Sequence, residues 1–312
     1  MRKSVVAVKP YIWENNSNFK LAPYEAWVKC GGKMSSSYYP PRILHGIAFH
    51  LEFPLWFKSK KEARLRFVEG ASIRLDTFPD SFFYEVIPVI WDCWPIYWDD
   101  TEKWFRKYDI RTAIFTSSQT ADEFRCRFPH MNILSITEGI EANLYRGEKL
   151  LKERSVDFLQ YGRVTKYLKK LHLEEKLRVL SSSGENSLIH TREQLIEYLS
   201  DAKIVLSIPR CDMQPEIANG IETLTQRYWE CMLSGVVIIG RAPKELIDLI
   251  GYNPVIDIDL QNIEEQLVGI VENIDKYQEL VNKNRVTALK FADWNIRIKQ
   301  IFNWLNQCNY NV

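Results

Sequence analysis

The chain has 312 residues, of which 46% are hydrophobic and 26% charged, and its formal net charge is +1. This composition is typical of a globular chain long enough for two domains, and it excludes wholesale disorder. No apolar run is long enough for a membrane-spanning helix, the start lacks the pattern of a signal peptide, and the six cysteines are scattered singly. We therefore expect a reduced, cytoplasmic chain without a structural zinc ion.

The charge is unevenly distributed along the chain. Residues 1–75 contain 13 Lys or Arg and 5 Asp or Glu, a net charge of +8, so the remaining residues carry −7. This asymmetry predicts an anionic partner for the N-terminal quarter. Nucleic acid is not the expected partner, because the sequence has no zinc-finger, basic-zipper or RNP motif. Most of the ten tryptophans precede residue 110, and aromatic residues beside basic ones fit a sugar platform, a membrane interface or core packing alike.

In the first half, short apolar runs alternate with amphipathic stretches. The apolar runs predict strands at residues 4–8, 87–92, 112–117 and 132–137. One helix is predicted around 101–108, and another after a capping box formed by Thr120 and Glu123. Strands that alternate with helices are typical of parallel βαβ units.

After a charged stretch at 146–154 the same alternation begins again. Strands are predicted at 156–161, 177–180, 203–208, 236–239 and 255–258. Helices are predicted at 191–201, 223–234, 243–250 and 293–308. Thr191 and Gln194 form a capping box for the first of these helices, and Gly235 suits the left-handed end of the second. We therefore predict an α/β protein of two Rossmann-like domains, residues 1–150 and 151–292. Residues 293–312 contain a final apolar helix that packs back toward the first domain.

The segment from Pro215 to Gly235 is the most informative for function. A loop with Asn219 and Gly220 leads into the helix predicted from residue 223, and Glu222 and Glu230 are eight positions apart. If both glutamates are helical, they lie about 12 Å apart along the axis, which resembles the distance from sugar to ribose in a nucleotide diphosphate sugar. Free N–H groups at residues 223–225 would lie between them and suit a diphosphate.

The wider context resembles the nucleotide-sugar domain of retaining GT-B glycosyltransferases of the family 4 type. The similar positions are the E-x7-E pair Glu222 and Glu230, the following 231–235, 242–246 and 251–256, the pair Gly162-Arg163 with Lys166, and Trp294. The resemblance covers roughly residues 156–305, about half of the chain, and extends weakly to 116–118 and 138–140. It implies two Rossmann-like domains facing across a cleft, with the second binding the donor.

The resemblance also implies roles for individual residues. Glu222 would approach the hydroxyls of the transferred sugar, Glu230 those of the ribose, and Arg163 and Lys166 the diphosphate, whose charge increases as it leaves. The remaining donor-binding candidates are Asn219, Gly220, Ile221, Thr223, Leu224 and Thr225. A surface salt bridge is the alternative for Arg163, and Lys169 and Lys170 compete with Lys166. The family is proposed to retain the sugar configuration by front-face attack, without cofactor, metal ion or enzymic nucleophile.

The acceptor side is less clearly marked. The Gly-rich loop that the family often has after its first strand is missing here. Asp92 is the last residue of a predicted buried strand, at the end where ligands gather in open α/β sheets, and is a catalytic and acceptor-binding candidate. Its alternative role is to cap the next helix. Trp94 and Trp98 can stack on a sugar or pack in the core. His45 is a further acceptor candidate, and His50 is similar to it.

Residues 55–66 combine aromatic side chains with Lys58, Lys60, Lys61, Arg64 and Arg66. This segment fits a peripheral contact with an anionic membrane at its inner face, or simply a solvated helix face.

Taken together, the motifs and the resemblance predict a metal-independent hexosyltransferase that moves a sugar from a UDP- or GDP-sugar to a glycan, glycolipid or glycoprotein. An epimerase-like enzyme and an inactive nucleotide-sugar-binding relative on the same fold are the alternatives.

Overall fold

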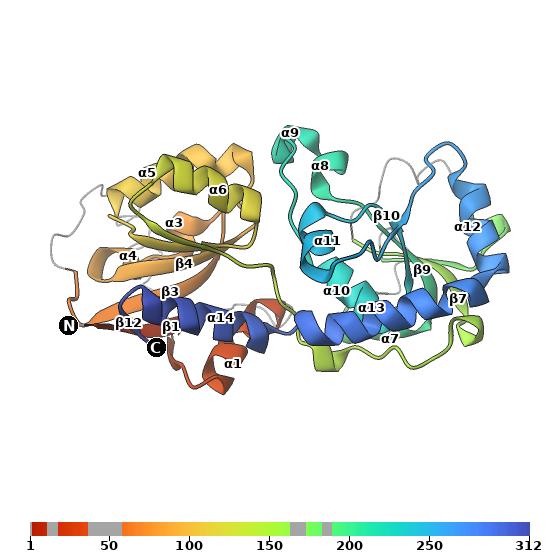
Figure 1. The fold of residues 1–312 in the computed structure, drawn as a ribbon, viewed down its shortest axis with the longest axis horizontal. Helices are drawn as coiled ribbons and strands as arrows, with labels where there is room; N and C mark the ends of the chain where they lie inside the picture. The colour runs from red at the N-terminus through yellow and green to blue at the C-terminus, as the bar shows by residue number, and fades with distance from the viewer. Residues whose placement is uncertain (1, 11–17, 37–57, 163–172, 183–188) are drawn as a thin grey trace. The chain divides into compact units, whose positions relative to one another are not determined.

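The computed structural model describes residues 2–10, 18–36, 58–162, 173–182 and 189–312 (Figure 1). The chain divides into two compact units. The first unit contains residues up to Gly139, the segment Glu216–Ile221 and the C-terminal Trp294–Val312. The second unit contains Ile140–Pro215 and Glu222–Asp293. Each unit is built on its own parallel sheet, and we describe each by itself.

The sheet of the first unit has the strand order β12-β1-β3-β4-β5-β6, with β2 also paired to β1. Its strands are β1 (Lys3–Lys9), β2 (Lys33–Ser36), β3 (Glu62–Glu69), β4 (Glu85–Trp91), β5 (Thr112–Phe115), β6 (Asn132–Ser135) and β12 (Tyr310–Asn311). The pairings are all parallel.

Helices cover both faces of this first sheet. α1 (Asn18–Lys29) and α14 (Trp294–Gln307) pack on one face, and α5 (Trp98–Lys107) and α6 (Ser118–Arg127) on the other. Residues of β4 alternate accordingly, since Ile87 and Val89 join the first cluster whereas Val86 and Ile90 join the second. The short helices α3 (Ile73–Asp76) and α4 (Asp80–Phe83) connect β3 to β4. In Figure 1 the blue α14 lies beside the red α1, which confirms that the final helix returns to the N-terminal part of the chain.

The sheet of the second unit has the order β11-β10-β9-β7-β8 and is also parallel. Its strands are β7 (Val156–Gln160), β8 (Val179–Ser181), β9 (Ala202–Ser207), β10 (Val237–Gly240) and β11 (Ile256–Asp257). The helices of this half of the chain are α7 (Arg192–Asp201), α8 (Arg210–Met213), α9 (Pro215–Ala218), α10 (Gln226–Ser234), α11 (Lys244–Ile250), α12 (Ile263–Glu272) and α13 (Gln278–Phe291). The predicted α/β class with Rossmann-like parallel sheets is confirmed.

Two of the three predicted local signals are confirmed. Thr191 and Gln194 form the expected capping box at the start of α7, and Gly235 ends α10 in the left-handed conformation with φ 63°. The capping box at Thr120 is wrong, because the N-cap of α6 is Ser117, whose hydroxyl accepts from the Thr120 N–H at 3.4 Å. Thr120 is instead buried inside the helix, and its hydroxyl donates to the Cys93 carbonyl at 3.3 Å.

The basic segment after residue 57 forms a strand rather than a solvated helix. Arg66 on β3 is 2% exposed, and its Nε donates to Asp80 at 2.7 Å. The Arg64 guanidinium packs 4.2 Å from the centre of the Tyr84 ring, and the Lys58 ammonium donates to the Tyr108 carbonyl. Most of these cations are therefore engaged within the first unit, while residues 55–57 lie outside the described part. In the described ranges no helix is long and apolar enough to cross a membrane.

Candidate functional site

The loop before α10 differs from its predicted form. α10 begins at Gln226 with Thr225 as N-cap, three residues later than expected, so Glu222 lies in the preceding loop and not on the helix. The helical spacing of about 12 Å therefore does not apply to this pair. The Leu224 N–H donates to the Glu245 carboxylate on α11 at 3.0 Å. The N–H groups of residues 223–225 were all predicted to be open to a diphosphate, and for the Leu224 N–H this prediction is wrong.

Glu222 is held by two donors from the segment after β10. The Lys244 backbone N–H donates to its Oε2 at 2.8 Å, and the Arg241 Nη1–H donates to its Oε1. Arg241 is itself fixed by Asp212, which accepts from Nε at 2.6 Å and from Nη2 at 2.9 Å. These hydrogen bonds to Asp212 are the main reason why the pKa of Arg241 is raised. The Glu222 carboxylate is therefore an oriented acceptor in the loop before α10, and its orientation comes from residues that sequence reasoning did not select.

Glu230 lies in the middle of α10 and is also oriented by two donors. The Tyr145 hydroxyl donates to its Oε1 at 3.0 Å, and the Tyr161 hydroxyl donates to its Oε2 at 2.9 Å. Both phenols are buried, and burial is the largest cause that raises the pKa of each, so both remain protonated donors. Each carboxylate oxygen has a further lone pair, which leaves Glu230 able to accept from a ligand hydroxyl.

Gly162 follows Tyr161, the residue after β7 whose hydroxyl donates to this carboxylate. Its φ is 76°, and a Cβ there would come within 1.8 Å of the Arg227 Nη2 atom. The Arg227 guanidinium packs over the Tyr161 ring at 4.7 Å from its centre. Glycine at 162 thus lets an arginine lie one turn before Glu230. The neighbouring candidates Arg163 and Lys166, with their competitors Lys169 and Lys170, lie outside the described residues.

The loop candidates Asn219 and Gly220 form a left-handed turn. Their φ values are 42° and 79°, and the Ile221 N–H donates to the Ala218 carbonyl at 2.8 Å. Asn219, Gly220 and Ile221 belong to the first unit, whereas Glu222 to Thr225 belong to the second. In the second unit the structure brings Glu222 together with Arg241, and Glu230 together with Tyr145 and Tyr161. Among the described residues no group of three or more His, Cys, Asp or Glu side chains could hold a metal ion.

Asp92 forms a tight turn directly after β4. Its φ of 50° is unusual for a residue other than glycine, and the Trp94 N–H donates to its carbonyl at 3.0 Å. Asp92 is not the N-cap of either following helix, since the caps are Trp94 and Tyr97, so its alternative role as a helix cap is wrong. Trp94 is 3% exposed, which places its ring inside the first unit. His45 and His50 lie outside the described part of the chain.

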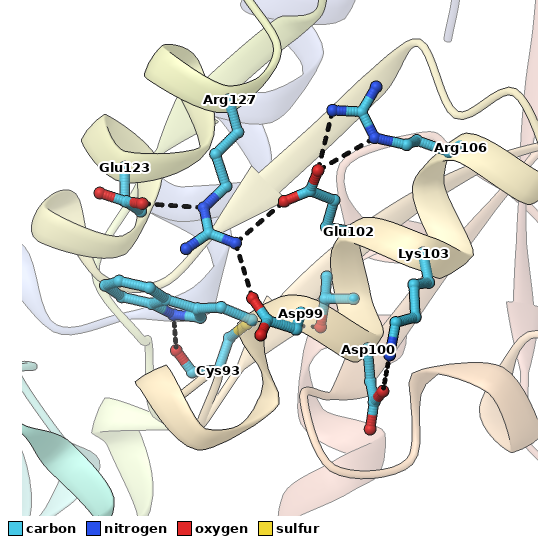
Figure 2. Close-up of polar contacts among 10 residues, drawn as sticks. Cys93, Asp99, Asp100, Glu102, Lys103, Arg106, Glu123 and Arg127 are labelled. Carbon is cyan, nitrogen blue, oxygen red and sulfur yellow. Dashed lines mark hydrogen bonds and ion pairs between the residues drawn. The ribbon is translucent and has the colours of Figure 1, made fainter.

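A polar network fixes the segment that follows Asp92 (Figure 2). Arg127 on α6 donates to Glu123 at 2.8 Å, to Asp99 at 3.1 Å and to Glu102 at 2.9 Å. The hydrogen bond to Glu123 is the largest cause that raises the pKa of Arg127. Its guanidinium lies 5.4 Å from the centre of the Trp98 ring, whose Nε1–H donates to the Cys93 carbonyl at 3.0 Å. Trp98, the first residue of α5, therefore links the loop at Cys93 to Arg127 on α6.

No model of a known protein family matches the chain, and no curated protein matches it in sequence. Its structure is similar to that of HepE from Anabaena in complex with UDP-glucose, with a TM-score of 0.58 and 9% identity over 96% of this chain and 99% of HepE. A glycosyltransferase from Rickettsia africae is similar over 100% of both chains, with a TM-score of 0.57 and 10% identity. The structure of TarM is similar over 80% of this chain, with a TM-score of 0.55 and 13% identity. The matched part spans only 55% of TarM. These likenesses show a shared fold and support the predicted GT-B class.

Proposed function

We propose that this protein is a glycosyltransferase that moves a sugar from a nucleotide diphosphate sugar to a glycan, glycolipid or glycoprotein acceptor. The observation that carries the proposal is the pair Glu222 and Glu230, two carboxylates held in fixed orientations, one in the loop before α10 and the other in the middle of that helix. Oriented acceptors suit the hydroxyls of a sugar and a ribose. The neighbours of known activity on this fold, among them the Rickettsia glycosyltransferase, support the same reading.

The donor we propose is a UDP- or GDP-linked hexose bound by the second unit. Glu222 accepts from the hydroxyls of the transferred sugar, and Glu230 accepts from those of the ribose through the lone pairs that Tyr145 and Tyr161 leave open. Structures of HepE contain UDP or UDP-glucose, and one of TarM contains UDP, which supports a nucleotide of this kind. Arg163 and Lys166 bind the diphosphate, since they follow the strand that ends beside Glu230.

The reaction we propose breaks the bond between the sugar and the diphosphate while the acceptor hydroxyl bonds to the same face of the sugar, so that the configuration is retained. The electron pair of the broken bond goes to the diphosphate oxygen, and cations that lie against this oxygen stabilise the charge. Arg163 and Lys166 have this role, without a metal ion. The acceptor proton passes to the leaving diphosphate, so no side chain has to act as a nucleophile.

We assign the acceptor to the first unit, with Asp92 as its polar contact at the carboxyl end of β4. Ligands of open parallel sheets gather at that edge, and the constrained turn fixes the direction of the side chain. One TarM structure contains α-GlcNAc-glycerol, which is consistent with a sugar-bearing ligand on this fold. A peripheral contact with an anionic membrane from the cytoplasmic side fits the exposed Lys60 and Lys61.

Thermal unfolding with a panel of nucleotides and nucleotide sugars tests the donor. A compound that binds only the folded chain raises the midpoint of unfolding, so the matching UDP- or GDP-sugar should give the largest shift. Glu230→Ala should remove most of that shift, whereas Glu272→Ala, at an exposed position on α12, should not change it. A chain that responds to no nucleotide would contradict the proposal.

A further inference from the structure

Arg297 lies in the first turn of α14 and is buried in the first unit, with 2% of its surface exposed. Its neighbours on the helix, Trp294, Ile298 and Ile301, belong to the apolar cluster beneath α14. Its Nε and Nη2 atoms are both shielded from solvent, and neither has a hydrogen-bond partner in the described part of the chain. Burial lowers the pKa of Arg297 to about 10, so the guanidinium remains charged at neutral pH.

The other buried arginines of the described residues all have acceptors. Arg66 is paired with Asp80 at 2.7 Å. Arg154 donates to the carbonyls of Ala202 at 2.8 Å and Ser234 at 2.9 Å. A buried charge without a partner is strongly unfavourable, because water no longer solvates it and nothing replaces the water. Arg297 is in this respect an exception among the buried arginines that the structure describes, and the exception requires an explanation.

The two unpartnered nitrogens lie on the same edge of the guanidinium. This edge directs two parallel N–H groups at the two oxygens of a carboxylate or phosphate. Three exposed or half-exposed arginines of this chain bind a carboxylate through the same edge. Arg241 donates to both oxygens of Asp212 at 2.6 and 2.9 Å. Arg106 donates from both nitrogens to one oxygen of Glu102 at 3.0 and 2.8 Å, and Arg111 to one oxygen of Asp109 at 3.0 and 2.8 Å. The indole Nε1 of Trp294, one turn of helix away from Arg297, is also buried without an acceptor.

We propose that the Nε–Nη2 edge of Arg297 binds an anion, namely a carboxylate or phosphate group. Because so little of the residue is exposed, the ligand is a small anion or a single anionic group, not a whole sugar. The site belongs to the first unit and is independent of the donor proposed for the second. It gives a reason for keeping a buried cation that the apo fold would be more stable without.

The test measures the midpoint of thermal unfolding of the full chain against the concentration of inorganic phosphate or of acetate, at constant ionic strength with sodium chloride. The two anions distinguish a phosphate from a carboxylate ligand. The wild-type midpoint should rise along a saturating curve with at least one of them. Arg297→Met should show no saturating rise, and without the anion its midpoint should equal or exceed that of the wild type. The response of the nucleotide site to UDP should be the same in both.

Arg106→Met is the matched control, because it removes one exposed cation and should keep the wild-type response. Arg297→Lys keeps the charge but has no fork, so its half-saturating anion concentration should be at least tenfold higher. If Arg297→Met does not fold, the half-saturating anion concentration of Arg297→Lys still tests the proposal. The proposal would be overturned if the wild type and either Arg297 variant had equal anion dependence. It would also be overturned if the wild-type midpoint showed no saturating rise with either anion.

Discussion

The candidate ligand-binding groups of the two units differ in how far the fold itself supplies their hydrogen-bond partners. In the second unit the carboxylates of Glu222 and Glu230 each have two donors before any ligand arrives. In the first unit the guanidinium of Arg297 is buried with an entire edge unpartnered. The first arrangement fixes the direction of an acceptor and leaves lone pairs for a ligand. The second leaves two buried N–H donors that have no acceptor among the described residues. The fold can therefore prepare a binding site in two ways. It can orient a polar group with hydrogen bonds before the ligand binds, or it can bury a polar group whose hydrogen-bond partner is supplied by the ligand.

The largest expected effect is on the oriented acceptor of the second unit. Glu222→Ala should lower the rate of sugar transfer at least ~100-fold, because the proposed contact with the reacting sugar is lost. The measurement is transfer from the donor found in the nucleotide panel. Glu272→Ala, on an exposed face of α12, is the control and should have wild-type activity. Full activity of Glu222→Ala would mean that the prepared carboxylate is structural.

The first unit contains a direct test of its own contrast, since Arg66 and Arg297 are equally buried but only Arg66 has an ion pair. Arg66→Met should destabilise the chain by about 3–5 kcal/mol, because it leaves Asp80 without its partner. Arg297→Met should cost nothing in the absence of the anion. Denaturant unfolding measures both. If the two substitutions destabilise equally, Arg297 has a partner after all and the contrast disappears.

The next largest expected effect is on the KM for the nucleotide sugar, and it concerns the two hydroxyls that orient Glu230. Tyr161→Phe and Tyr145→Phe each remove one hydroxyl donor, and each should raise the KM for the nucleotide sugar about tenfold, the usual worth of one hydrogen bond to a charged group. The kcat should change less. Tyr252→Phe is the matched control, because its hydroxyl bonds Asn284 and Thr287 in the same unit and does not contact Glu230. A rise in KM common to all three would point to general loosening instead.

A smaller effect separates backbone strain from side-chain position in the second unit. Gly162→Ala and Gly251→Ala both place a Cβ at positive φ, so both should cost about 1 kcal/mol of stability. Only the Cβ at 162 meets Arg227, which must then leave the Tyr161 ring. Donor affinity should therefore fall in Gly162→Ala alone. Equal affinity in both variants would mean that the position of Arg227 over the Tyr161 ring does not affect donor binding.

The smallest effect concerns the exposed cations of the first unit. Lys60→Glu with Lys61→Glu should change the free energy of unfolding by less than about 0.5 kcal/mol, because both side chains face solvent. Binding to anionic vesicles, measured by co-sedimentation at several salt concentrations, should fall. Arg111→Glu, an exposed cation at another loop, is the control. If vesicle binding is absent from the wild type, the membrane contact is excluded.

The elements that could be predicted are those whose signals are local in the sequence. The capping box of Thr191 with Gln194 and the left-handed Gly235 depend only on nearby residues, and both are found. The start of α10 could not be predicted correctly, because the Leu224 N–H is taken by Glu245, which is 21 positions away. The strand β3 was missed because Arg64 and Arg66 suggest a surface, whereas Arg66 is buried against Asp80 at the start of α4.

The candidate site shows the same division. The spacing of Glu222 and Glu230 is common by itself, and only the surrounding segments that resemble family 4 glycosyltransferases make both carboxylates candidates from the sequence. No sequence pattern identifies their partners, because these reach the carboxylates only when separate strands and loops come together. The partners are Tyr145, Tyr161 and Arg241. Arg297 could not be noticed either, since what distinguishes it is the lack of a partner in the folded chain.

The return of α14 and β12 to the first unit also has a consequence for the order in which the chain takes shape on the ribosome. The second unit is complete once Asp293 has been synthesised, whereas the first still lacks the helix that covers α1 and the strand that pairs with β1. Until then the side chains that contact α14, such as Trp27 and Phe67, have no cover on that side. The half that is translated first is therefore the half that is finished last, and it depends longest on protection from aggregation.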